Sequence, residues 1–290
     1  MYGIYYGIML VMILYNLFLY ISIRDRSYLY YVFYIFTFGL VQLSLTGFSF
    51  QYLWPDSPWM ANRAIPFWGG LALFFTLTFT RSFLETARIM PRWDRLIIGS
   101  QLLAVAACFG GLLLPYRLST QLVTYAAVII MLIILSVSIE SLRLGNRAAR
   151  FFFAAWICLI IGAIVFSLMA TGIMPANEIT RNGLYIGSAL EVILLSLALA
   201  DRINLENREK AVIQEQSLEH LRRFQSVFEH AREGLFQFSL IGRVIHANPA
   251  LVDIFGYDSM EDLLANFSSA EQQLYVNLND MERYNREMSR

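Results

Sequence analysis

Long apolar stretches dominate the first two hundred residues of the chain. A helix needs about 20 mainly apolar residues to cross the hydrocarbon core of a bilayer, and these stretches have that length. The connections between them are short and polar. The pattern predicts an all-α polytopic membrane bundle of seven transmembrane helices. The expected spans are Gly3–Ile23, Leu29–Phe50, Ile65–Phe83, Leu96–Leu114, Gln121–Ile139, Phe151–Ile173 and Gly183–Ala200.

The seventh stretch does not end at a loop. No proline or glycine follows Gly187 before the chain reaches Phe228, so the helix is expected to continue into a charged segment. This linker helix, residues 204–228, favours a weak parallel coiled coil, since several apolar residues fall near a and d positions. Polar residues occupy other such positions, and a solvated single helix is the alternative. The apolar positions are Ala211, Leu218, Leu221 and Phe228.

After Glu233 the hydrophobic period becomes that of strands. Residues 234–239 and 243–247 read as two strands, and residues 240–242 between them as a tight turn with a glycine. Asn248 and Pro249 then open a helix that ends before Gly256. A further helix is expected from Ser259, which has an acidic residue at capping-box spacing. The segment therefore predicts a partial α+β module, and the domains are 1–203, 204–228 and 229–290.

The arginines are distributed unequally between the two sets of loops. Short loops rich in Lys and Arg stay in the cytoplasm, so the richer side is expected to be cytoplasmic. This rule places the N-terminus outside and the C-terminal tail inside. The richer side carries Arg24, Arg26, Arg81, Arg88, Arg92, Arg95, Arg143, Arg147 and Arg150, and the other side carries Arg63, Arg117 and Arg181.

Composition and missing motifs exclude several classes of protein. The formal net charge of zero gives no reason to expect a nucleic-acid partner. Cys108 and Cys158 lie inside apolar runs without metal-ligand spacing, and no catalytic constellation stands out in the sequence, so no enzyme is expected within this chain. The single lysine, Lys210, follows the last span, which excludes a retinal Schiff base in the bundle. No cofactor motif is evident, and the sequence does not identify a ligand for the C-terminal module.

Glu191 is the one acidic residue deep inside a predicted span. Ionisable groups inside a membrane are costly, and by default they are functional candidates. Glu191 could be a protonation switch or a ligand contact, paired with Asn16, Gln42 or Gln101. The alternative is a protonated side chain that joins helices structurally. Asn16 and Gln42 are likewise either interhelical hydrogen-bonding residues or ligand contacts.

Several motifs of residues 1–205 carry a resemblance to a known family. The segment resembles the bacterial seven-transmembrane receptors with diverse intracellular signalling modules. The resemblance implies a receptor in the bacterial inner membrane, with Asp201, Arg202 and Ile203 in signal relay. The motifs are Tyr5-Tyr-Gly-Ile8, Leu14-Tyr-Asn-Leu-Phe-Leu19, Arg24-Asp-Arg-Ser-Tyr-Leu-Tyr-Tyr31, Gly47–Pro55 and, most distinctive, Leu195-Ser-Leu-Ala-Leu-Ala-Asp-Arg-Ile203.

The C-terminal segment from Phe224 to Arg290 resembles the first half of a PAS domain. The resemblance implies that later strands lie beyond Arg290, after a helical stretch near residues 272–285. The chain is therefore expected to be a fragment of a longer protein. Output modules that follow in similar proteins include diguanylate cyclases, phosphodiesterases, adenylate cyclases and histidine kinases. The motif residues are Gly234, Gly242, Asn248, Pro249, Gly256 and Tyr257.

Two functional hypotheses follow. The first is a signalling receptor that passes an extracellular or intramembrane cue through its seventh helix to the PAS module and an output domain. Its expected partners are the lipid bilayer, an unknown small-molecule ligand and a second copy bound through the linker helix. The alternative is a transporter or channel with a cytoplasmic regulatory tail, which would show internal repeats and broken spans.

Overall fold

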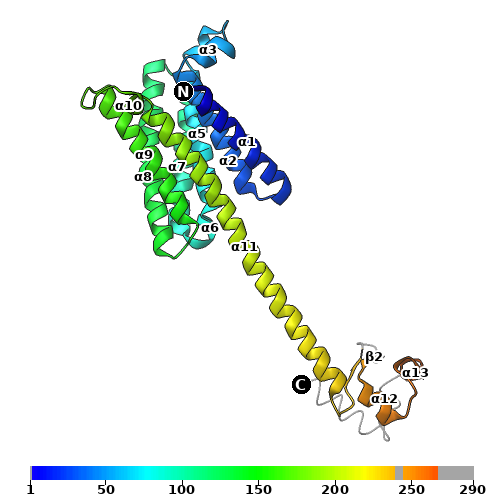
Figure 1. Ribbon diagram of the computed structural model, residues 1–290. Helices are drawn as coiled ribbons and strands as arrows, with labels where there is room; N and C mark the ends of the chain where they lie inside the picture. Colours follow the sequence, from blue (N-terminus) through cyan, green and yellow to red (C-terminus); the bar gives the residue numbers. More distant parts are fainter. Residues whose placement is uncertain (1, 239–243, 267–290) are drawn as a thin grey trace. The chain divides into compact units, whose positions relative to one another are not determined.

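The computed structural model describes residues 2–238 and 244–266 (Figure 1). The chain divides into two compact units, Met1–Glu206 and Asn207–Arg290. The first unit is helical, and its long helices lie side by side in one bundle (Figure 1). The long helices are α1 (Tyr2–Ile23), α2 (Arg26–Leu45), α5 (Ala64–Phe83), α7 (Pro91–Leu113), α8 (Tyr116–Arg143), α9 (Ala149–Ala170) and α11 (Gly183–His230). Short helices between them are α3 (Phe48–Tyr52), α4 (Pro58–Ala61), α6 (Thr86–Ile89) and α10 (Glu178–Arg181).

The predicted all-α polytopic membrane bundle is confirmed. Among the described residues, six helices are long and apolar enough to cross a membrane: α1, α2, α7, α8, α9 and α11. The third predicted span coincides with α5, which has 20 residues. It is not among these six helices, and it contains two glycines, three threonines and Arg81. The predicted helix count is therefore supported by six strongly apolar helices and one of mixed character.

The second predicted span, Leu29–Phe50, is wrong at its C-terminal end. Helix α2 stops at Leu45, and Gly47 follows with φ +81°. Glycine adopts this left-handed conformation readily, and it turns the chain into the separate short helix α3. At the other end, α2 begins one residue after Asp25, whose carboxylate accepts a hydrogen bond from the Ser27 N–H. That cap fixes the entry into the helix.

Helices α9 and α11 approach so closely that only glycine fits between them. A Cβ atom added to Gly187 would lie 2.7 Å from the carbonyl oxygen of Cys158 and 3.0 Å from the Cα of Gly162. A Cβ added to Gly162 would in turn lie 2.5 Å from the carbonyl oxygen of Gly183. Small residues allow this kind of backbone contact between membrane helices, where van der Waals packing replaces the hydrophobic effect.

The second unit contains the end of α11 and a small α+β module. Strand β1 (Phe236–Phe238) pairs antiparallel with β2 (Val244–Ala247), and the helices α12 (Pro249–Phe255) and α13 (Met260–Asn266) follow. The predicted bounds of α12 are confirmed, and the α13 N-terminus is capped by the Ser259 hydroxyl as expected. The core of the module consists of Ala247, Leu251, Val252 and Leu263. The predicted turn at 240–242, including Gly242, and the predicted helical stretch at 272–285 lie outside the described residues.

Candidate functional site

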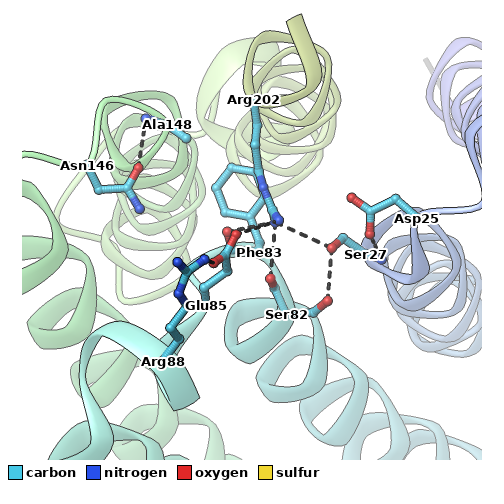
Figure 2. A network of polar contacts seen from close by, with 9 residues as sticks. All are labelled: Asp25, Ser27, Ser82, Phe83, Glu85, Arg88, Asn146, Ala148 and Arg202. Carbon is cyan, nitrogen blue, oxygen red and sulfur yellow. Dashed lines mark hydrogen bonds and ion pairs between the residues drawn. The ribbon is translucent and has the colours of Figure 1, made fainter. Parts of the chain in front are cut away.

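Arg202, on α11, is the centre of a polar network in the first unit (Figure 2). Its Nη1 donates to the backbone carbonyl oxygens of Ser82 and Phe83, over 3.1 and 3.0 Å, and reaches the Ser27 hydroxyl over 3.5 Å. Its Nη2 donates to Glu85 Oε1 over 2.9 Å. These contacts, called the Arg202 network below, join α11 to the C-terminal end of α5, to the start of α2 and to the segment before α6.

The network places a cation where α5 has unpaired carbonyl groups. The last carbonyl oxygens of a helix lack intrahelical donors and carry partial negative charge, so a buried arginine there is favourable. The Arg202 side chain is only 15% exposed. It also lies over the Phe83 ring, 5.8 Å from the ring centre. The guanidinium is therefore held by neutral dipoles, an aromatic face and a carboxylate together.

Glu85 and Ser27 are fixed by contacts of their own. Glu85 has left-handed backbone angles, φ 49° and ψ 42°, which are uncommon for a residue with a side chain. Its second carboxylate oxygen lies 3.7 Å from Arg88. The Ser27 hydroxyl lies 2.9 Å from that of Ser82, across from α2 to α5. Figure 2 shows these groups gathered around the guanidinium.

The two neighbours of Arg202 in the predicted relay motif have different positions. Ile203 is buried, 8% exposed, and belongs to the main hydrophobic core. Asp201 is half-buried at the surface of the same turn. Of the three predicted relay residues, Arg202 makes polar links to other helices and Ile203 packs in the apolar core.

Glu191 lies fully buried at the centre of the bundle. The Tyr34 hydroxyl of α2 donates to Glu191 Oε1 over 3.0 Å, while Oε2 has no hydrogen-bond partner among the described residues. One turn earlier on α2, the Tyr31 hydroxyl donates to the carbonyl oxygen of Val192. The expected pairing of Glu191 with Asn16, Gln42 or Gln101 is therefore wrong, because α2 presents tyrosines to this part of α11.

Asn16 contacts α11 at a different level of the bundle. Its side chain exchanges two hydrogen bonds with the Ser196 hydroxyl, over 3.1 and 3.2 Å, and it also donates to the carbonyl oxygen of Met12. Gln42 is buried, and its Oε1 has no hydrogen-bond partner among the described residues. Gln101 donates instead to Thr78. Asn16 of α1 and Tyr34 of α2 therefore both bond to α11, Asn16 at Ser196 and Tyr34 at Glu191.

A second ion pair, missed from the sequence, lies near the same end of α5. Arg81 holds Asp94 of α7 with two hydrogen bonds, of 2.7 and 3.0 Å. The Thr86 hydroxyl donates to the same carboxylate over 2.7 Å. Asp94 lies in the first turn of its helix, where a negative charge is favourable. This pair anchors α5 to α7.

Asn248 organises the α+β module. Its Oδ1 accepts from the N–H groups of Leu235 and Leu251, over 2.8 and 3.0 Å, and its Nδ2 donates to the Glu233 carbonyl over 2.9 Å. The side chain is fully buried and so links the segment before β1 to the start of α12. Pro249 occupies the first position of α12, where its missing N–H has no consequence.

The other PAS motif residues have steric roles. A Cβ added to Gly234 would lie 2.5 Å from Leu251 Cδ1 and 3.3 Å from Leu251 Cα, so a larger residue here would displace the Leu251 side chain. Gly256 ends α12 with φ +74°. Tyr257 packs, half-buried, on the small core. Among the described residues, no three His, Cys, Asp or Glu side chains form a group that could hold a metal ion.

The fold and these contacts define a polytopic membrane protein with a PAS-type module. The family model for 7TM diverse intracellular signalling matches residues 1–202, and the model for the PAS domain matches residues 222–287. The chain therefore belongs to the 7TM diverse intracellular signalling family, whose members are membrane sensory receptors, and both matched regions are sensory. No curated protein and no solved structure matches the chain.

Proposed function

We propose that this receptor relays a cue from its membrane bundle through α11 to the PAS module, and from there to an output domain. The observation that carries the proposal is the Arg202 network. It lies on the one helix that belongs to the bundle at Gly183 and ends at His230, directly before the PAS strands. The proposed setting is a bacterial inner membrane, with the C-terminal tail in the cytoplasm, as the arginine distribution indicates.

The network suits a two-state switch because its bonds depend steeply on distance. Hydrogen bonds of 2.9–3.1 Å are lost when donor and acceptor separate by roughly 1 Å more. A small shift or rotation of α11 would therefore exchange these bonds for others. A stimulus can drive that exchange only by binding one of the two states more tightly.

The proposal includes a homodimer formed through the linker helix. Leu218 and Leu221 are both 55% exposed on α11, at adjacent positions of the predicted a/d stripe. Two such stripes would cover each other in a parallel coiled coil, and a change in register would then reach both PAS modules. Neighbouring polar residues on the stripe keep the contact weak enough to rearrange.

A reporter fusion tests the relay. Residues 1–290 are joined to a diguanylate cyclase domain, and cyclic di-GMP is measured in cells with equal membrane levels of each variant. We expect Arg202→Ala to change the output several-fold. The matched control is Arg147→Ala, which removes an exposed arginine from the α8–α9 loop. An unchanged output in Arg202→Ala would favour a transporter or channel with a regulatory tail.

A further inference from the structure

A polar pocket of about 410 Å³ is formed by residues of α2, α5, α6 and α7. Pockets that bind small molecules have volumes of about 300–1,000 Å³, so this one has room for a ligand. It begins at Arg26, the first residue of α2, and reaches inward to Gln101 of α7, which donates to the Thr78 hydroxyl over 2.9 Å. The ends of membrane-spanning helices lie at the level of the lipid headgroups. The pocket therefore opens where lipid headgroups and hydrocarbon meet.

Positive charge is in excess around this pocket. Three arginines line it, and Glu85 is the one acidic residue among the described residues of its wall. The first arginine, Arg81, is held by Asp94. Glu85 is shared, since Arg202 contacts its Oε1 over 2.9 Å and Arg88 lies 3.7 Å from its Oε2. Four guanidinium groups therefore meet two carboxylates, and an anion is the ligand that would balance them.

Arg26 and Arg88 are the two lining arginines that can bind such an anion. The Arg26 side chain is exposed and has no hydrogen bond or ion pair with another described residue. The Arg88 side chain is 87% exposed, and its contact with Glu85 is longer than a hydrogen bond. A guanidinium group donates in parallel to two oxygens of a phosphate, which makes arginine well suited to phosphate binding.

We propose that the pocket binds the headgroup of an anionic phospholipid, with the phosphate held by Arg26 and Arg88. Basic pockets between membrane helices are suited to such headgroups. A zwitterionic headgroup fits less well, because its ammonium group would enter the same excess of positive charge.

The surface beside the pocket favours a lipid over a free phosphate. Phe33 of α2 and Phe75 of α5 stack there, with ring centres 5.0 Å apart. Phe33 is three residues beyond Tyr30 in the pocket wall, so it continues the same face of α2 into the membrane. The Phe33 ring is 40% exposed. It offers an apolar surface to the acyl chains of a bound lipid, and a soluble phosphate would make no use of it.

The pocket shares two residues with the Arg202 network. Ser82 and Glu85 line the pocket and also bond to Arg202. Figure 2 shows Arg88 beside Glu85, on the side away from Ser27. A phosphate bound by Arg88 would withdraw that arginine from Glu85 and leave the carboxylate to Arg202. This effect on α11 rests on the proposed relay, whereas the lipid site itself does not.

Two lipids with the same acyl chains test the site. Native mass spectrometry of the purified chain in detergent measures the binding of phosphatidylglycerol, which is anionic, and of phosphatidylcholine, which is zwitterionic. One arginine near an anionic headgroup strengthens binding about fivefold, so we expect a preference for phosphatidylglycerol of about that size or more. Glycerophosphoglycerol is the same headgroup without acyl chains, and it should bind far more weakly. Equal affinity for the two lipids, or for the headgroup alone, would overturn the proposal.

A pair of double variants locates the binding. Arg26→Gln with Arg88→Gln should weaken phosphatidylglycerol binding about 25-fold, which is fivefold for each arginine. Arg147→Gln with Arg150→Gln removes two exposed arginines beside the α8–α9 connection and should preserve it. Arg81 is kept, because its pair with Asp94 anchors α5 to α7. Equal losses in the two double variants would show a general effect of surface charge and would overturn the site.

Thermal unfolding provides an independent readout. Phosphatidylglycerol should raise the unfolding temperature of the parent chain and of the Arg147 and Arg150 variant, and should not raise that of the Arg26 and Arg88 variant. Unfolding without added lipid verifies that all three chains are folded. An equal rise in all three chains would contradict the site.

The lipid assay needs no signalling output. Absence of a preference for phosphatidylglycerol overturns the lipid site and leaves the Arg202 relay standing. An unaffected cyclase fusion in Arg202→Ala overturns the relay, even when the lipid binds. In a fusion that responds to Arg202→Ala, Arg88→Gln should also change the output, while Arg147→Gln should not.

Discussion

The guanidinium of Arg202 lies 2.9 Å from the carboxylate of Glu85, which is 117 residues earlier in the chain. The pair joins the last turns of the membrane part of α11 to a strained backbone position between α5 and α6. Because Glu85 has left-handed backbone angles, its carboxylate is presented to Arg202 by a conformation that few residues adopt. The contact therefore depends on the backbone conformation of Glu85 as well as on the two side chains.

Arg202→Ala should release the segment between α5 and α6. The change removes hydrogen bonds to two carbonyl groups and one carboxylate, and we expect a loss of about 1–3 kcal/mol in the free energy of unfolding. Amide hydrogen exchange of residues 82–90 should become faster by one to two orders of magnitude. Arg202→Lys keeps the charge but loses the planar guanidinium fork, so the exchange rate of this segment should lie between those of the parent chain and of Arg202→Ala. Unchanged exchange in Arg202→Ala would contradict the network.

Tyr34→Phe should leave Glu191 without its hydrogen bond while preserving the packing of the ring. Glu191→Gln keeps an acceptor for the Tyr34 hydroxyl and should insert into the membrane normally. We expect both variants to change the output of the cyclase fusion, Tyr34→Phe by the larger factor. Wild-type output over the full range of pH in both variants would rule out a switch role for this pair.

Asn16 and Ser196 should be coupled energetically. Hydrogen bonds between membrane helices contribute about 0.6 kcal/mol on average and up to about 1.7. Since this pair exchanges two bonds, we expect a coupling near the upper value in a double-mutant cycle of Asn16→Ala and Ser196→Ala. Unfolding in mixed micelles measures each corner of the cycle. Additive effects of the two substitutions would show that the bonds contribute nothing.

Gly187→Ala should separate α9 from α11. The new methyl group would lie 2.7 Å from the Cys158 carbonyl oxygen, so a backbone must move, at a cost of about 1–3 kcal/mol. Gly99→Ala is the control, because nothing lies within 4 Å of a Cβ atom there. That change should be neutral or slightly stabilising, as alanine favours helix. Thermal unfolding of the two variants in the same detergent gives the comparison.

Asn248→Ala should loosen the α+β module without affecting the bundle. The change removes the acceptor of the Leu235 N–H and leaves the Leu251 N–H with only the Asn248 carbonyl oxygen, and we expect a local loss of about 1–3 kcal/mol. Asn248→Asp keeps the acceptor and loses the donor to Glu233, so it should be less damaging. Limited proteolysis of the full chain would detect faster cleavage within residues 231–256, while the bundle stays intact.

Patterns within single segments made the helices predictable. The period of apolar residues located the spans, and Asn248, Pro249 and Gly256 located α12 to the residue. The end of the second span was missed because Phe48 and Phe50 continue the apolar pattern beyond Gly47, whose left-handed backbone angles stop the helix. The hydrophobic pattern alone does not predict this change of backbone conformation.

The pairing of polar groups could not be predicted in the same way. Glu191 stood out as an acid in an apolar run, but its partner Tyr34 is one of many tyrosines in the sequence. Which helix faces Glu191 depends on the packing of α2 against α11, and no local pattern contains that information. Glu85 resembled an ordinary charged loop residue until the fold placed the end of α5 beside Arg202. The three-residue spacing of Tyr31 and Tyr34 predicts that they share one face of a helix, but it does not predict which helix that face contacts.

In the proposed relay, the glycine contact between α9 and α11 would set how far a small motion is carried. Gly187 touches α9 with its backbone, and we propose that α11 tilts about this point. Arg202 follows fifteen residues later, at a distance of about 22 Å along a helix with a rise of about 1.5 Å per residue. A tilt of about 3° at Gly187 would therefore displace the guanidinium by about 1 Å, enough to break its bonds to α5. The length of the helix amplifies the tilt, and the contact at Gly187 is made by backbone atoms alone.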